Sequence, residues 1–188
     1  MKNKTNLLII AIFSLWTILF RTSLHIAPNI EFVTALSALS GYLLYKDSKA
    51  YLIPLIVMGV TDLIIGNSII FIFTWTGFLL PVLLSKKLFN KSLFSNNKTL
   101  DKLFGSILIG LGSTVFFFLW TNFGVVITTE MYSKDLFGLF SSYFNALPFL
   151  KMQLVGNLFF VPAFIFAGDF IVNNLPTLKA KLSTLKQK

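Results

Sequence analysis

Cysteine is absent from the 188-residue sequence and histidine occurs once, at His25. The lack of cysteine excludes disulfides, thiolate metal sites and a cysteine nucleophile. A single histidine argues against a transition-metal site with several imidazole ligands, and the sequence has no phosphate loop, GxSxG motif or HExxH motif. We therefore expect no metal, no cofactor and no catalytic residue, so the chain is predicted not to be an enzyme.

Charge is also scarce, because only 12% of the residues are charged whereas 55% are hydrophobic. The mean hydropathy is +0.79. A soluble domain of this size could not bury so much apolar surface, so the bilayer is the predicted solvent. The net charge of +9 would suggest nucleic acid binding in a soluble protein, but the positions of the lysines favour a different explanation.

Apolar runs predict an all-α integral membrane protein that forms a single domain. The runs lie at about residues 5–20, 31–45, 50–66, 68–85, 103–122 and 151–173, which predicts six transmembrane helices. The first run follows Lys2 and Lys4 and could belong to a signal peptide. Because no small-x-small cleavage pattern follows it, we favour a retained first helix. A basic tail, residues 178–188, ends the chain.

The basic residues then predict an orientation. If all six runs cross and the N-terminus is cytoplasmic, the outer side receives Arg21, Lys134 and Lys151, and the other thirteen of the sixteen basic residues are cytoplasmic. This is the bias of the positive-inside rule. It predicts cytoplasmic N- and C-termini in an inner membrane, with anionic lipids as partners and no nucleic acid.

Residues 133–147, SKDLFGLFSSYFNAL, carry apolar side chains at helical spacing after Ser133, a candidate N-cap. This helix is too short to span a bilayer comfortably. We expect a short amphipathic helix along the outer surface, between the fifth and sixth spanning helices.

Small residues recur at helical spacing in two runs. Thr34, Ala38 and Gly41 share a face, and Ser106 and Gly110 form a similar pair. Such spacing lets helices approach closely, and we expect packing within the chain rather than docking of another protein.

Polar residues gather at one predicted depth, in the outer half of the membrane. Residues 21–32, RTSLHIAPNIEF, contain the only Arg and the only His, and intramembrane ionisable groups usually face a cavity or a partner. The predicted substrate-binding residues of an outward-facing pocket are Arg21, His25, Asn29, Asp62, Trp75, Trp120, Asn122 and Asn157. Gln153 lies one turn before Asn157 on the same helical face.

Several of these residues have plainer interpretations. Trp75 and Trp120 could be interfacial anchors, Arg21 could contact lipid headgroups, and His25 could be an ordinary loop residue. Asp62 could simply pair with Arg21.

Longer stretches show a family resemblance: APNIEFVTALSALSGYL after Arg21, then PLIVMGVTDLIIG, TNFGVV and LFGLFSSYFNALPFLKMQLVGNLFF. They resemble an uncharacterised bacterial family of six-helix membrane proteins, grouped with the substrate-binding S components of energy-coupling-factor (ECF) transporters. The resemblance implies a bacterial inner-membrane protein that binds a vitamin or similar small nutrient from outside. It also implies a transmembrane coupling protein and ATPases as partners, or occasionally solitary action.

Two departures from that family bear on the partners and the ligand. Many S components dock the coupling protein through an Ala-xxx-Ala face on the first helix, whereas Ala11 is followed here by Leu15. Solitary action, or docking through the small face of the second helix, is therefore open. The nickel- and cobalt-type S components begin Met-His, whereas this sequence begins Met-Lys, which disfavours metal ions as ligands.

The leading functional hypothesis is capture and uptake of a small, vitamin-like organic nutrient. The alternative is a structural or assembly membrane protein whose outer polar residues satisfy one another. A third possibility is an intramembrane enzyme, which would have to recruit His25 from a loop for a Ser–His pair.

Overall fold

The computed structural model describes residues 2–24, 32–66, 68–89 and 97–185, and every regular element among them is a helix. The elements are α1 (Lys2–Thr22), α2 (Val33–Leu43), the 3-10 turn η1 (Ser48–Tyr51), α3 (Leu52–Ile65), α4 (Phe71–Gly77), α5 (Leu79–Leu88), α6 (Lys98–Thr128) and α7 (Leu136–Leu185). The predicted all-α class is confirmed.

Five helical segments of the described chain are long and apolar enough to cross a membrane. They are Lys4–Thr22, Ser48–Ile65, Phe71–Leu88, Lys98–Thr128 and Leu136–Asn174. These segments overlap five of the six predicted spans, and they are compatible with a multi-pass membrane protein.

The remaining predicted span, residues 31–45, contains the short helix α2. At a rise of 1.5 Å per residue its 11 residues extend about 16 Å, roughly half the hydrocarbon thickness. Ten of these residues are buried, because α2 packs against α1, α3, α5, α6 and α7. A helix that is buried on all sides lies at the centre of a bundle, and the three serine and threonine residues of α2 are small enough to be buried with it.

Contacts at the two ends of α2 give its direction. At its C-terminal end the Asn6 amide nitrogen of α1 donates to the carbonyl oxygen of Leu43 over 2.8 Å, so this end lies beside the start of α1. At its N-terminal end Thr34 shares a cavity with Arg21, near the end of α1. The two helices are therefore antiparallel, and α2 carries the chain back toward the end where it began.

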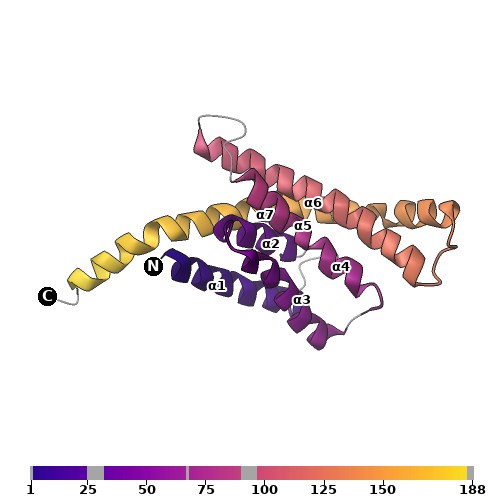
Figure 1. Cartoon of the computed structure of the whole chain (residues 1–188), viewed down its shortest axis with the longest axis horizontal. Coiled ribbons are helices and arrows are strands. Elements are labelled where there is room, and N and C mark those ends of the chain that lie inside the picture. Colours follow the sequence, from indigo (N-terminus) through magenta and orange to yellow (C-terminus); the bar gives the residue numbers. More distant parts are fainter. Residues whose placement is uncertain (1, 25–31, 67, 90–96, 186–188) are drawn as a thin grey trace.

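Figure 1 shows the start of α1 and the end of α7 toward the same end of the bundle, with the α6–α7 connection at the opposite end. The end near Arg21 and the α3–α4 connection is called the Arg21 end below, and the end near Asn6 and Leu43 is called the Asn6 end.

Small residues let two pairs of these helices touch, as predicted. A Cβ atom at Gly41 would lie 2.5 Å from the Val82 carbonyl oxygen of α5, and the Ser85 hydroxyl donates to the Ala38 carbonyl over 2.7 Å. A Cβ atom at Gly110 would lie 2.9 Å from the Asn157 carbonyl oxygen of α7. Packing within the chain is thus confirmed. The small face of α2, left open above as a docking surface for another protein, is covered by α5.

The predicted separate surface helix at residues 133–147 is corrected as well. From Leu136 onward this segment is the first part of α7, which continues for 50 residues through Pro148. Its cap also differs from the prediction: the Asp135 carboxylate accepts the Gly138 backbone N–H and the Ser133 hydroxyl, each over 2.8 Å. Asp135 is the residue before the first helical turn and its partner is the third helical residue, which is N-cap geometry.

Candidate functional site

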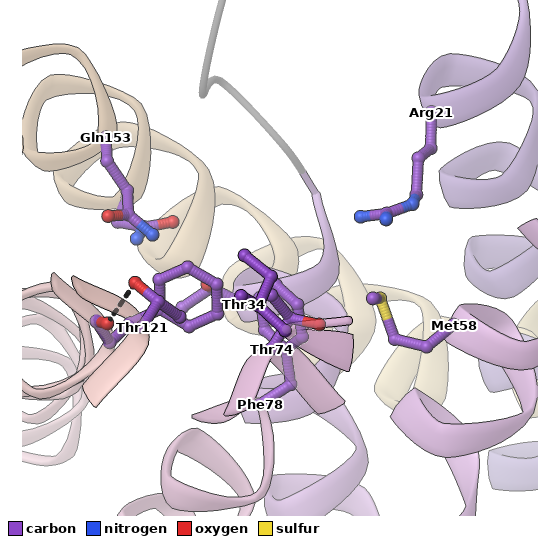
Figure 2. Close-up of a pocket in the computed structure, with 10 residues that line it drawn as sticks. Arg21, Thr34, Met58, Thr74, Phe78, Thr121 and Gln153 are labelled. Atoms are coloured by element: carbon purple, nitrogen blue, oxygen red, sulfur yellow. Dashed lines mark hydrogen bonds between the residues drawn. The ribbon is translucent and has the colours of Figure 1, made fainter. Parts of the chain in front are cut away.

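A cavity of about 220 Å³ opens among the helices at the Arg21 end. Figure 2 shows how its lining side chains lie. The lining comes from six helices or their ends and consists of Arg21, Thr34, Met58, Ile70, Thr74, Phe78, Phe117, Thr121, Gln153 and Asn157. Polar residues from many segments therefore converge on one cavity, although this set of residues differs in part from the predicted one.

The cavity has an apolar floor. Met58 of α3 and Phe78 at the α4–α5 junction are 1% and 3% exposed and pack with Val33 of α2. The rings of Phe78 and Phe117 have centroids 4.7 Å apart. Buried aromatic and thioether groups of this kind suit a flat, largely apolar part of a ligand.

A guanidinium group forms one wall. The Arg21 Nη2 atom lies 3.0 Å from Asp62 Oδ1, and the two side chains are only 14% and 7% exposed. The Trp75 indole N–H donates to the other Asp62 oxygen over 2.7 Å. Asp62 therefore orients Arg21 and is itself held by Trp75, whereas neither Asp62 nor Trp75 lines the cavity.

Two amides on α7 face the guanidinium from the opposite wall. In Figure 2 the side chains of Gln153 and Arg21 extend into the space from opposite sides. The Asn157 amide nitrogen donates to the Thr114 hydroxyl over 2.9 Å, which orients the amide. In the part of the chain that the structure describes, the Gln153 amide has no hydrogen-bond partner, so its donors and acceptor are available to a ligand.

Three threonines complete the polar lining. The Thr121 hydroxyl donates to the Phe117 carbonyl over 2.8 Å and the Thr74 hydroxyl donates to the Phe71 carbonyl over 3.0 Å. Because a hydroxyl that donates to its own helix keeps its oxygen lone pairs, both threonines can still accept. Thr34, 3% exposed, adds a third hydroxyl from the central helix.

Two predicted residues lie elsewhere. The Trp120 indole N–H donates to the Thr76 hydroxyl over 2.8 Å, and its ring is 5.0 Å from that of Phe73. Asn122 turns toward α7, where its side-chain oxygen lies 3.3 Å from the Ser142 hydroxyl. Neither residue lines the cavity. The predicted His25 and Asn29 lie outside the described residues.

Sequence reasoning overlooked most of the lining. Phe117 with Thr121, and Thr74 with Phe78, are pairs four residues apart, so each pair shares a helical face. This spacing was a usable signal, because the predicted residues Trp75 and Asn122 are direct neighbours of Thr74 and Thr121 in the sequence. Among the residues that the structure describes, no group of three His, Asp or Glu side chains could hold a metal ion.

The fold and the cavity define a class: an all-helical protein with several apolar helices of membrane-spanning length and a polar-lined cavity near one end. The chain belongs to the DUF6580 family, a family of unknown function whose model matches residues 1–178. No curated protein and no solved structure matches the chain.

Proposed function

We propose that this protein is a membrane-embedded binding component for uptake of a small organic nutrient. The observation that carries the proposal is the cavity at the Arg21 end. There a mostly buried guanidinium faces an amide that has no hydrogen-bond partner among the described residues, over an apolar floor. Concave, mostly apolar sites with a few convergent polar groups are the usual form of small-molecule sites.

The lining suggests the kind of ligand. A volume of about 220 Å³ is below the range of about 300 to 1,000 Å³ typical of drug-sized ligands, so the nutrient is small. A flat or ring-shaped part would lie against Phe78 and Phe117. A carboxylate or carbonyl oxygen would accept from Arg21, and polar ring substituents would bind Gln153 and the Asn157 oxygen.

The orientation follows from the lysines. If the Asn6 end is cytoplasmic, the lysine-rich connections and both termini are in the cytoplasm, as the positive-inside rule requires, and the cavity lies in the outer half. In this arrangement α2 brings the chain back from the outer to the cytoplasmic side. It is too short to span the bilayer alone, and the neighbouring helices shield it from lipid. The membrane is a bacterial inner membrane by the resemblance described above.

A partner that drives uptake, as in ECF transporters, would need an accessible surface. Because α5 covers the small face of α2, a candidate docking helix is α1, as in the related family, and its outward face contains Leu8, Ala11, Leu15 and Leu19, all exposed. Docking there would use a leucine-rich surface instead of an Ala-xxx-Ala face. Solitary action is the alternative.

Substitution of Gln153 gives a clean test. Since the Gln153 amide has no partner in the described structure, Gln153→Leu should keep the fold and weaken ligand binding. We expect affinity for the nutrient to fall at least about tenfold, the loss for one hydrogen bond of about 1.4 kcal/mol. The assay is a thermal-shift screen of purified protein against a nutrient library, followed by titration of the hits.

The matched control is Asn145→Leu, because Asn145 is an exposed amide on the same helix and outside the cavity. Its binding should equal that of the unsubstituted protein. An equal loss of affinity in both variants, or no loss in Gln153→Leu, would show that the cavity is not the binding site.

One observation favours a second candidate, a structural or assembly protein without a ligand. Both Asp62 oxygens are occupied by protein donors, Arg21 and Trp75, so part of the polar cluster satisfies itself. In that case no library compound raises the melting temperature. The expectation that the chain is not an enzyme stays a prediction.

A further inference from the structure

A carboxylate and a carbonyl group would both suit the N–H donors of Arg21, and the charge of the cavity distinguishes between them. Arg21 is the only charged residue among the ten described residues that line the cavity at the Arg21 end. Its Nη2 atom lies 3.0 Å from Asp62 Oδ1. The guanidinium therefore has a counter-ion within the protein, and in the described part of the site the two charges cancel.

A ligand with a net charge would disturb this balance. An anionic ligand would add a second carboxylate beside Asp62, and because the Arg21 and Asp62 side chains are mostly buried, water would screen little of the resulting negative charge. A cationic ligand would meet no acidic residue in the described lining, and both Asp62 oxygens already accept, from Arg21 and from the Trp75 indole. The described lining therefore favours a ligand without net charge.

The opposite walls of the cavity offer different hydrogen-bonding groups (Figure 2). The Arg21 guanidinium has only N–H donors, so it requires an acceptor. The Gln153 amide has no hydrogen-bond partner in the described chain and offers both N–H donors and an oxygen acceptor. An amide group of a ligand has the same combination, so it can pair edge to edge with Gln153 through two hydrogen bonds. A carboxylate would meet the Gln153 nitrogen but would leave the Gln153 oxygen without a donor.

The floor between these walls fits a flat ring. The rings of Phe78 and Phe117 have centroids 4.7 Å apart, and a Cβ atom at Gly77 would lie 2.7 Å from the Phe117 ring. The Phe117 ring is thus packed against the backbone of α4, which holds it in position. Planar rings stack on such a surface, and with about 220 Å³ available we expect a single ring.

We infer, on the basis of the function proposed above, that the nutrient is an uncharged, planar ring compound with a hydrogen-bond acceptor at one edge and an amide group at the opposite edge. The acceptor receives a hydrogen bond from Arg21, and the amide pairs with Gln153. The ring lies against Phe78 and Phe117.

Three matched probes test the charge: pyridine-4-carboxamide is neutral, pyridine-4-carboxylate is an anion and pyridine-4-carboxamidine is a cation. They have the same ring and nearly the same size, and the ring nitrogen lies opposite the variable group. Dissociation constants are measured at pH 7 by ligand-observed NMR titration of the full chain in detergent. We expect the carboxamide to bind at least about tenfold more tightly than either charged probe. A charged probe that binds as tightly as the carboxamide, or no binding of the carboxamide, overturns the inference.

Two variants test the assigned contacts. Asp62→Asn removes one negative charge beside Arg21, so the ratio of carboxylate to carboxamide affinity should rise at least about tenfold. In Gln153→Leu the carboxamide should lose its advantage over the N,N-dimethylcarboxamide, which keeps the carbonyl group but has no N–H. The control Asn145→Leu should keep both preferences, because Asn145 does not line the cavity. An unchanged ratio in folded Asp62→Asn, or an unchanged advantage in Gln153→Leu, overturns the inference; if Asp62→Asn does not fold, Gln153→Leu provides the test.

Failure of this inference differs from failure of the proposed function. A charged library compound that binds the natural chain and is lost in Gln153→Leu would overturn the uncharged ligand and leave the binding function standing. If neither the probes nor any library compound bind, both are overturned.

Discussion

The ion pair between Arg21 and Asp62 should be strongly coupled, and a double-mutant cycle can measure this. The substitutions are Arg21→Met, Asp62→Asn and both together. Each single variant removes one charge of this ion pair, whose two side chains are mostly buried, at 14% and 7% exposed. The double variant has neither charge, and its new amide can still accept from the Trp75 indole.

Two magnitudes compete here. Breaking a buried ion pair on one side costs about 3 to 5 kcal/mol in soluble proteins, whereas hydrogen bonds between membrane helices are worth about 0.6 kcal/mol on average and about 1.7 kcal/mol at most. The guanidinium keeps its charge when Asp62 is replaced, so the cost of breaking a buried ion pair applies to Asp62→Asn. We expect a loss of about 3 kcal/mol in that variant and a smaller loss in the double variant than in either single one.

The assay is reversible unfolding of the purified variants in mixed micelles, followed by circular dichroism. The cycle should give a coupling free energy of at least about 2 kcal/mol, well above the roughly 0.5 kcal/mol expected of independent sites. Additive losses would refute the reasoning, because they would mean that Asp62 does not hold the guanidinium in place.

Two further predictions concern the packing and the helix cap. Gly41→Val should destabilise the fold by at least about 2 kcal/mol, since its first added carbon would meet the Val82 carbonyl at 2.5 Å, and the same unfolding assay measures it; unchanged stability would contradict the close approach. Hydrogen bonds from Gly138 and Ser133 hold the pKa of the Asp135 carboxyl below its usual value, so the cap is present above the unfolded pKa of about 4 and is lost as pH falls through the folded value. Amide hydrogen exchange at Gly138, corrected for intrinsic rates, should therefore accelerate on acidification below pH 4 in the natural chain and show no such step in Asp135→Asn; a step in both would assign it to another group.

Helix positions were largely predictable from hydropathy, because apolar runs report which residues avoid water. The length of α2 was not predictable in this way. Residues 31–45 are mostly apolar, and hydropathy does not distinguish a helix buried by neighbours from one exposed to lipid. The small residues around Gly41 carried that information, since close approach to α5 requires them.

The level of the cavity along the helices was also partly predictable, whereas helix rotation was not. Thr121 lines the cavity and Asn122 does not, although they are adjacent, because one residue turns the helix by about 100°. Gln153 and Asn157 were placed on one face correctly, since residues four apart share a face whatever the rotation. Choosing between neighbours such as Thr121 and Asn122 requires knowing which helices surround α6.

The separate helix expected at residues 133–147 shows a different limit, because Pro148 follows it directly. Proline removes a backbone donor and usually ends a helix in water. Inside a membrane protein, neighbouring groups and the cost of exposed backbone can keep such a helix continuous. In the structure α7 runs through Pro148, so the local rule was outweighed by its surroundings.

Identification of the bound small molecule tests the central claim most directly. The measurement is native mass spectrometry of the gently purified chain, with extraction and identification of any retained compound, for the natural sequence and Gln153→Leu. Binding at the Arg21 end predicts one small polar organic molecule per chain in the natural protein and its loss in Gln153→Leu. An empty protein that also shows no thermal shift with any compound of a nutrient library would contradict the proposed function.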